Sequence, residues 1–157
     1  MTEAGPARKK KAMKKIAGFI ITIPGQPVGK ARARVTRSGH AFTPKKTEVA
    51  EATIRQLFVA RYPDAEPIIG PVAIDITAFL GIPRSHSEKR KQLMLIGEIL
   101  PTQRPDVDNI GKLICDALES IAYHNDSQVV LMLIKKIYSL TPRLEIRIKQ
   151  KNERGSS

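Results

Sequence analysis

The chain has 157 residues, which is the length of one ordinary domain, and its 27 lysine and arginine residues against 15 aspartate and glutamate residues give a formal net charge of +12. Such a charge favours nucleic acid as the partner, because a strongly basic surface attracts a polyanion. The single cysteine excludes an intramolecular disulfide and is typical of a cytoplasmic protein, and the three scattered histidines exclude a His/Cys zinc pattern. No apolar run approaches the roughly 20 residues of a membrane-spanning helix.

The two ends of the chain differ in composition from its centre. Residues 1–14 carry many lysines, and no small-residue cleavage motif follows the apolar segment after them, so we expect a disordered basic arm and not a secretory signal. Residues 151–157 are expected to be a disordered tail. One folded domain is therefore expected at 15–150.

The predicted elements occur in the order β-α-β-α-α-β-β, which indicates an α+β (mixed α/β) domain with a small mixed sheet of about four strands and two to three helices. The clearest helix has one buried face, formed by Ile110, Leu113, Ile114, Ala117, Leu118 and Ile121. In chain order we expect a buried strand at 16–23, a Gly- and Arg-rich loop or ribbon at 24–43, a helix from Thr43-Pro44 to Tyr62, a strand at 72–80, a short helix from a capping box at 85–88 toward Ile96, the helix at 110–121, and strands at 129–138 and 143–149.

Acidic side chains gather between residues 104 and 130 of this otherwise basic chain. Asp106 and Asp108 stand two residues apart in an extended lead-in, so they can share one cation, and Asp108 is placed to cap the helix that follows. We expect Asp126 to return beside the N-terminus of that helix. Two or three carboxylates, waters and a phosphate oxygen make an ordinary Mg²⁺ site, with Lys112 as a fixed cation for charge that develops on phosphorus.

The same residues have a simpler interpretation. The Asp-x-Asp-Asn sequence before a helix can be nothing more than an N-cap. The four-residue spacing of Asp108, Lys112 and Asp116 can likewise reflect nothing more than exposed ion pairs, each worth a few tenths of a kcal/mol. A calcium loop is excluded, because Ile110 and Ala117 stand where oxygen ligands are needed.

The basic segment at 24–43 alternates cations with small residues. If it is extended, Lys30, Arg32 and Arg34 lie along one edge about 6–7 Å apart, close to the spacing of successive phosphates. Phe42 follows near a flexible tip, where it can stack on an unpaired base or serve as a hydrophobic anchor. The segment therefore indicates nucleic-acid binding mainly in combination with the acidic cluster.

The ordered combination of these segments resembles one known family. The runs are Pro-x-Gly-Lys-Ala-Arg-x-Arg at 27–34, Arg-Pro-Asp-Val-Asp-Asn-Ile-x-Lys-x-x-x-Asp-Ala-Leu at 104–118 and Asn-Asp-Ser-Gln-Val at 125–129. Together they closely resemble the RusA family of Holliday junction resolvases, over about residues 16–149. The resemblance implies a RusA-like fold and a homodimeric, Mg²⁺-dependent endonuclease, with Mn²⁺ as an alternative ion, that makes paired nicks in four-way DNA junctions.

By motif position, the resemblance implies metal binding and catalysis by Asp106, Asp108 and Asp126, an essential lysine at Lys112, and a supporting role for Asp116. Two positions depart from the family pattern. Asn125 stands where members often have a second aspartate. Pro105 separates Arg104 from the first aspartate, whereas some members have an arginine directly before it.

We therefore predict a structure-selective endodeoxyribonuclease of the cytoplasm that acts on branched DNA in recombination or repair. The expected DNA contacts are Lys30, Arg32, Arg34, Arg37, Phe42 and Arg104. Two alternatives remain open. A non-catalytic basic nucleic-acid-binding protein would bind DNA equally well without Mg²⁺, and a general nuclease would keep the site without the preference for junctions.

Overall fold

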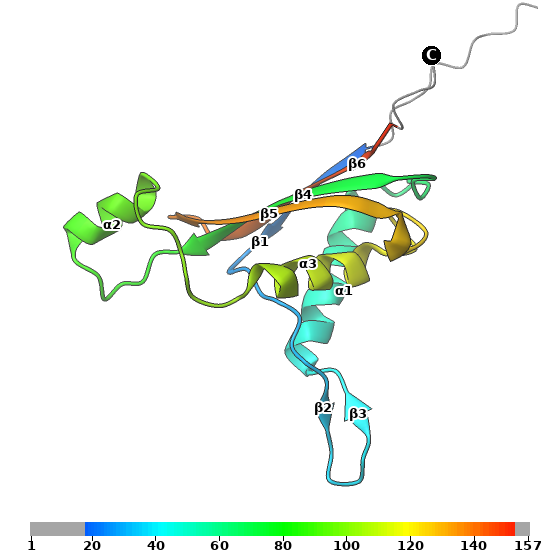
Figure 1. Ribbon diagram of the computed structural model, residues 1–157, viewed down its shortest axis with the longest axis horizontal. Helices are drawn as coiled ribbons and strands as arrows, with labels where there is room; N and C mark the ends of the chain where they lie inside the picture. Colours follow the sequence, from blue (N-terminus) through cyan, green and yellow to red (C-terminus); the bar gives the residue numbers. More distant parts are fainter. Residues whose placement is uncertain (1–17, 153–157) are drawn as a thin grey trace, which may run out of the picture.

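A computed structural model describes residues 18–152, and its centre is a mixed four-stranded sheet (Figure 1). The strands are β1 (Gly18–Pro24), β4 (Val72–Gly81), β5 (Val129–Ser139) and β6 (Arg143–Gln150), in the spatial order β1-β6-β4-β5. β4 pairs in parallel with β5, and the other pairs are antiparallel. The predicted α+β domain with about four strands is confirmed, whereas the predicted arm at 1–14 and most of the predicted tail lie outside the described residues.

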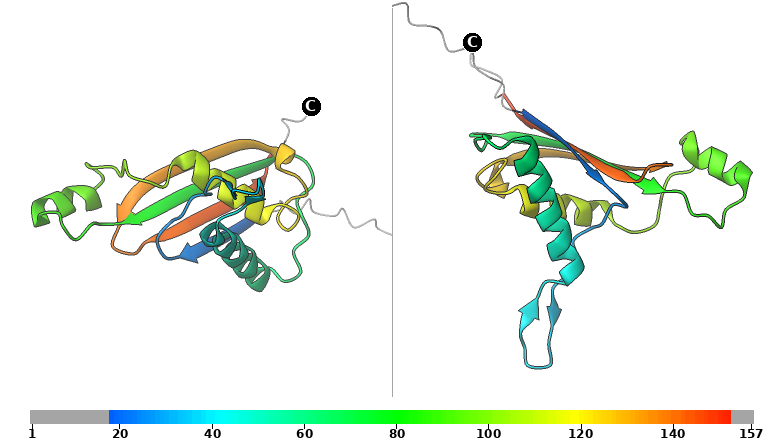
Figure 2. Two further views of the ribbon diagram at one scale, coloured as in Figure 1. Left: turned by 90° about the horizontal axis from the view of Figure 1, so that it is seen from below. Right: turned by 180° about the vertical axis from the view of Figure 1, so that it is seen from behind.

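Two helices cover one face of this sheet (Figures 1 and 2). They are α1 (Lys45–Arg61) and α3 (Val107–Leu118), which also pack against each other. Alternate residues of β4 and β6 point toward them and are buried, as are Ile54 and Phe58 of α1. Gly111 brings α3 close to β5, because a Cβ atom there would lie 2.7 Å from Ile134 Cδ1. The core therefore fixes α3 directly against the sheet.

The third helix, α2 (Glu88–Leu95), projects beyond one end of the sheet (Figure 1). At a different place a short hairpin of β2 (Arg34–Val35) and β3 (Ala41–Phe42) projects away from the body (Figure 2). We call residues 24–33, which join β1 to this hairpin, the strap. The loop or ribbon predicted at 24–43 is thus a strap followed by a hairpin.

The helix starts differ from the predicted ones. α1 begins at Lys45 with Pro44 at the N-cap position, and α2 has Ser87 as N-cap, whose hydroxyl accepts from the Arg90 N–H at 3.4 Å. α3 begins at Val107, so Asp106 and not Asp108 holds the N-cap position. Each predicted cap lies one or two residues from the observed one, because periodicity does not fix the exact first residue of a helix. Within residues 18–152, no helix combines the length and apolar composition needed to cross a membrane.

Candidate active site

Helix α3 carries predicted acids at both of its ends. Asp106 and Asp108 lie at its N-terminus, Lys112 is exposed in its middle, and Asp116 lies in its last turn. Asp108 and Asp116 are therefore separated by about 12 Å along the helix axis, since each residue advances the helix by about 1.5 Å. One rigid helix thus presents two separate acidic ends.

Asp126 lies at the C-terminal end of α3. It begins the short 3₁₀ helix η1 (Asp126–Gln128), and the hydroxyl group of the buried Tyr123 lies 3.3 Å from Asp126 Oδ1 and 3.0 Å from the carbonyl oxygen of Cys115. The expectation that Asp126 returns beside the N-terminus of α3 was wrong. β5 runs back along α3, so it is the far end of β5 that reaches the helix start, where Lys136 Nζ donates to the carbonyl oxygen of Pro105 at 3.1 Å.

This placement separates the three predicted metal ligands. Within residues 18–152, no three histidine, cysteine, aspartate or glutamate side chains are grouped so that they could hold one metal ion. A pair of carboxylates with waters and a substrate phosphate oxygen is nevertheless enough for Mg²⁺. Asp106 and Asp108 are both exposed, and the Asp106 side chain accepts no capping hydrogen bond from α3, so both carboxylates are open to an ion. The extended lead-in predicted for both residues was wrong, because α3 begins at Val107 and Asp108 lies in its first turn, where residues two apart do not share a face. Asp126 does not join them in the single chain.

The surroundings of Asp126 disfavour its charged form. Partial burial raises the pKa of Asp126 above the ordinary aspartate value, and the nearby Glu119 carboxylate raises it further, while the hydrogen bond from Tyr123 lowers it. Burial likewise raises the pKa of the Cys115 thiol, which makes that thiol a weak nucleophile at neutral pH. The C-terminal end of α3 is thus rich in carboxylates, and one of them, Asp116, is already ion-paired with the ammonium group of Lys30.

An open groove of about 1000 Å³ runs between the strap, the start of α1 and the start of α3. The cations that line it are Lys30, Arg32, Arg34, Lys46 and Arg104, and Asp106 lies among them. Four of the predicted DNA contacts and one predicted metal ligand therefore meet in a single groove. A phosphodiester bound by these cations would lie close to the N-terminal acidic end of α3.

The remaining predicted DNA contacts belong to the hairpin. Arg37 lies in its turn, and Phe42 pairs with Arg34 across the two strands and is 47% exposed. Val35 on the opposite face of the ribbon is 67% exposed. Phe42 is therefore not a hydrophobic anchor of the core, and a solvent-exposed aromatic ring remains free to stack on a base.

Sequence reasoning missed two residues of this region. Lys46 lines the groove, and the signal for it was the Lys45-Lys46 pair at a predicted helix start, where α1 meets the basic segment. Glu51 lies one turn further into α1, with its Oε1 atom 3.4 Å from Lys30 Nζ. No pattern in the sequence points to Glu51, because the contact joins residues whose approach depends on how the strap folds over α1.

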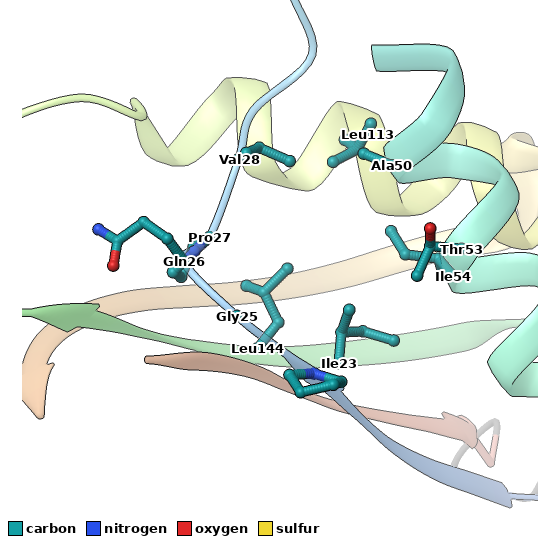
Figure 3. A pocket seen from close by; sticks show the side chains of 11 residues that line it. Ile23, Gly25, Gln26, Pro27, Val28, Ala50, Thr53, Ile54, Leu113 and Leu144 are labelled. Atoms are coloured by element: carbon teal, nitrogen blue, oxygen red, sulfur yellow. The ribbon is translucent and has the colours of Figure 1, made fainter. Parts of the chain in front are cut away.

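A smaller pocket of about 130 Å³ lies beneath the strap, between α1, α3 and the sheet (Figure 3). Its lining is mostly apolar and includes Ile23, Val28, Ile54, Leu113 and Leu144, with no charged side chain. Because no cation lines it, this pocket is not a phosphate-binding site. It belongs to the packing under the strap and not to the polar groove.

Two comparisons with known proteins agree with these features. The family described as Endodeoxyribonuclease RusA matches residues 24–149, a span that contains the strap, the hairpin and both ends of α3. The chain is also similar to YqaN, an uncharacterized protein of Bacillus subtilis (strain 168), with 35% identity over 134 residues, covering 82% of this chain and 94% of YqaN.

Proposed function

The chain belongs to the RusA family of endodeoxyribonucleases, and on this basis we propose that it is a divalent-metal-dependent endonuclease that resolves four-way DNA junctions. Mg²⁺ is the proposed ion, with Mn²⁺ as an alternative. The observation that supports this most directly is the groove, because it combines cations for the phosphodiester backbone with Asp106 at the start of α3. A protein that only binds DNA gains nothing from a carboxylate in a phosphate-binding groove, where it repels the ligand.

The proposed chemistry divides the work between the acids and the cations. Asp106 and Asp108 would hold the ion, with Asp126 as the third proposed ligand and Asp116 in a supporting role. A bound Mg²⁺ supplies a Lewis acid and an activated water at neutral pH. Lys112 lies one turn beyond Asp108 on α3 and would stabilise the negative charge on the phosphoryl oxygens in the transition state. Arg32, Arg34, Lys46 and Arg104 would hold the phosphates on either side.

Resolution of a four-way junction requires more than one catalytic groove. Resolution of a junction needs two symmetric nicks, so we propose a homodimer whose two-fold axis matches the pseudo-symmetry of the substrate. The projecting hairpin would supply the contact to unpaired or unstacked bases at the branch point, through Phe42.

One assay tests this function. The protein is incubated with a synthetic four-way junction and with a linear duplex of matched sequence, each with and without Mg²⁺, and the products are separated on a denaturing gel. We expect Mg²⁺-dependent nicks in two opposed strands of the junction and little cleavage of the duplex. The Asp108→Asn variant serves as the control for contaminating nucleases.

The separation of Asp126 from Asp106 and Asp108 favours a second candidate, a non-catalytic basic protein that binds branched nucleic acid. That candidate predicts equal binding with and without Mg²⁺ and no cleavage at any Mg²⁺ concentration. Equal cleavage of junction and duplex would instead identify a general nuclease.

A further inference from the structure

Lys30 lies in the groove, but its side chain is directed to two carboxylates. Its ε-ammonium group forms an ion pair and a hydrogen bond with Asp116 and lies 3.4 Å from Glu51 Oε1. The side chains are only 28%, 28% and 25% exposed for Lys30, Asp116 and Glu51. Glu51 Oε1 is buried, and among residues 18–152 it has no hydrogen-bond partner, so the nearby ammonium is its main compensation.

The backbone around Lys30 is attached to the same two helices. The Lys30 N–H group donates to the carbonyl oxygen of Asn109 on α3 at 2.9 Å, and the Ala31 N–H group donates to Thr47 Oγ1 on α1 at 3.1 Å. At Gly29 the strap lies so close to α3 that a Cβ atom would stand 2.9 Å from Asn109 Cβ. Three successive residues thus fasten the strap to α1 and α3.

A phosphate contact by Lys30 would be costly in this setting. The ammonium would have to leave Asp116 and Glu51, and a buried carboxylate oxygen would lose its counter-charge. The one ammonium group of Lys30 is also shared by two carboxylates, so little of its charge is left for a phosphate. Arg32 and Arg34 differ in this respect, because both are exposed and form no ion pair among the described residues.

We propose that Lys30 is a positioning residue and not a DNA contact: its ion pairs with Asp116 and Glu51 lock the strap onto α3 and so set the spacing between the phosphate-binding arginines and Asp106. This corrects the role expected for Lys30 from the spacing of basic residues. It also gives Asp116 a function, since the carboxylate at the last turn of α3 holds the strap, which carries Arg32 and leads directly into Arg34 of β2.

The attachment of the strap by the Lys30 ion pairs can be tested without DNA, and therefore independently of the proposed nuclease function. Hydrogen exchange is measured on the full chain for the backbone amides of the strap, above all those of Lys30 and Ala31. Lys30→Met keeps the aliphatic stem and removes the charge, and it should speed exchange in the strap by about tenfold or more while leaving the core of α3 protected. Lys30→Arg should restore most of the protection, and Arg32→Met, the matched control on the same strap, should change nothing.

Two further variants separate the charge effect from the fit of the backbone. Asp116→Asn should speed strap exchange as Lys30→Met does, and the double variant should be little worse than either, because both remove one interaction. Gly29→Ala should lift the strap by contact with Asn109 and produce the same local exchange without any change of charge. Unchanged strap exchange in Lys30→Met would overturn the proposal.

DNA binding supplies the second readout, measured without Mg²⁺ as a function of salt. Arg32→Met should lower the slope of log affinity against log salt by about one, as expected for one lost phosphate contact, whereas Lys30→Met should weaken binding at an unchanged slope. If Lys30→Met lowers the slope as Arg32→Met does, Lys30 contacts phosphate and the proposal is wrong. If the wild-type protein binds no DNA, the proposed function fails and the exchange measurement still decides the lock.

Discussion

The buried hydroxyl group of Tyr123 faces the carboxylate of Asp126, with 3.3 Å between Tyr123 Oη and Asp126 Oδ1. The same hydroxyl lies 3.0 Å from the carbonyl oxygen of Cys115, so one proton serves two acceptors. This relationship ties the segment after α3 to the last turn of that helix. Asp126 is an exposed residue, but the partial burial of its carboxyl group and the nearby Glu119 and Asp116 carboxylates raise its pKa and so disfavour its ionised form.

We predict that Asp126 makes the folded protein less stable as the pH rises. Because its pKa is raised in the folded state, the native protein holds this proton more tightly than the unfolded chain does, whose aspartate pKa is about 3.9. The favourable contribution is complete below the unfolded value and is lost as the pH rises through the raised native value. Urea unfolding in EDTA should therefore show that Asp126→Asn raises the free energy of unfolding above that of the wild type at pH 7, and that it raises it less at pH 3.5.

The control for this measurement is Asp64→Asn, which alters an exposed carboxylate in the turn after α1. A gain in stability at pH 7 of equal size in both variants would show that the gain does not depend on the surroundings of Asp126. In a Tyr123→Phe background, Asp126→Asn should raise the stability at pH 7 by more, since Tyr123→Phe removes the hydrogen bond that lowers the pKa of Asp126.

The acids at the start of α3 should be needed for cleavage and not for binding. Asp106→Asn and Asp108→Asn remove charges proposed to hold the metal, and each should lower the cleavage rate about 100-fold or more. Affinity for the junction should stay the same or rise slightly, because a carboxylate that repels phosphate is gone. Single-turnover cleavage and gel-shift binding on one junction measure the two effects separately.

Asp126→Asn in the same assay decides whether the second acidic end takes part. The family resemblance predicts loss of cleavage here too, which would mean that both ends of α3 act together in the DNA-bound protein. Wild-type cleavage by Asp126→Asn would confine the reaction to the start of α3. Asp116→Asn should keep partial activity.

Sequence patterns predicted the regular elements well and the approach of side chains less well. The apolar stripe of α3 and the alternation along β4 depend on local periodicity, and both elements form. The predicted end of α3 was wrong, because the helix stops at Leu118 and Ile121 lies in the turn that follows. The position of Asp126 depends instead on the direction in which β5 runs along α3, which periodicity does not specify. Lys30 shows the same limit: its charge and spacing are visible in the sequence, but Glu51 and Asp116 become its neighbours only through the fold of the strap.

Lys112 should act on the rate of the chemical step. It is exposed on α3, between the two acidic ends, and forms no ion pair among the described residues, so its ammonium group is free to face a phosphate. Lys112→Ala should lower kcat by about 100-fold with little change in the Mg²⁺ concentration that gives half-maximal rate. A variant that merely needs more junction DNA to reach the normal kcat would show that Lys112 binds substrate.

Phe42 should contribute to the preference for branched DNA. It is exposed on one face of the hairpin, whereas Val35 is exposed on the other face of the same ribbon. Phe42→Ala should weaken binding to a four-way junction about tenfold, with little effect on a duplex, because one base-stacking contact is worth about 1–3 kcal/mol. Val35→Ala is the matched control, and an equal loss in both variants would point to a disturbed hairpin and not to stacking.

The last prediction concerns the proposed homodimer. β5 is an edge strand, and its outer residues Leu131 and Leu133 are 51% and 55% exposed. An exposed apolar edge strand is a ready surface for a second copy, so Leu133→Glu should shift the protein from dimer to monomer in sedimentation at micromolar concentration. Ile20→Glu is the matched control, because Ile20 is 51% exposed on β1 at the opposite edge of the same sheet.

On a supercoiled plasmid with an extruded cruciform, the wild-type dimer should make two nicks in one encounter and yield linear DNA. The monomeric variant should yield nicked circles, since the first nick releases the supercoiling that holds the cruciform. A wild-type protein that sediments as a monomer, alone and on junction DNA, and still linearises the plasmid would contradict the homodimer.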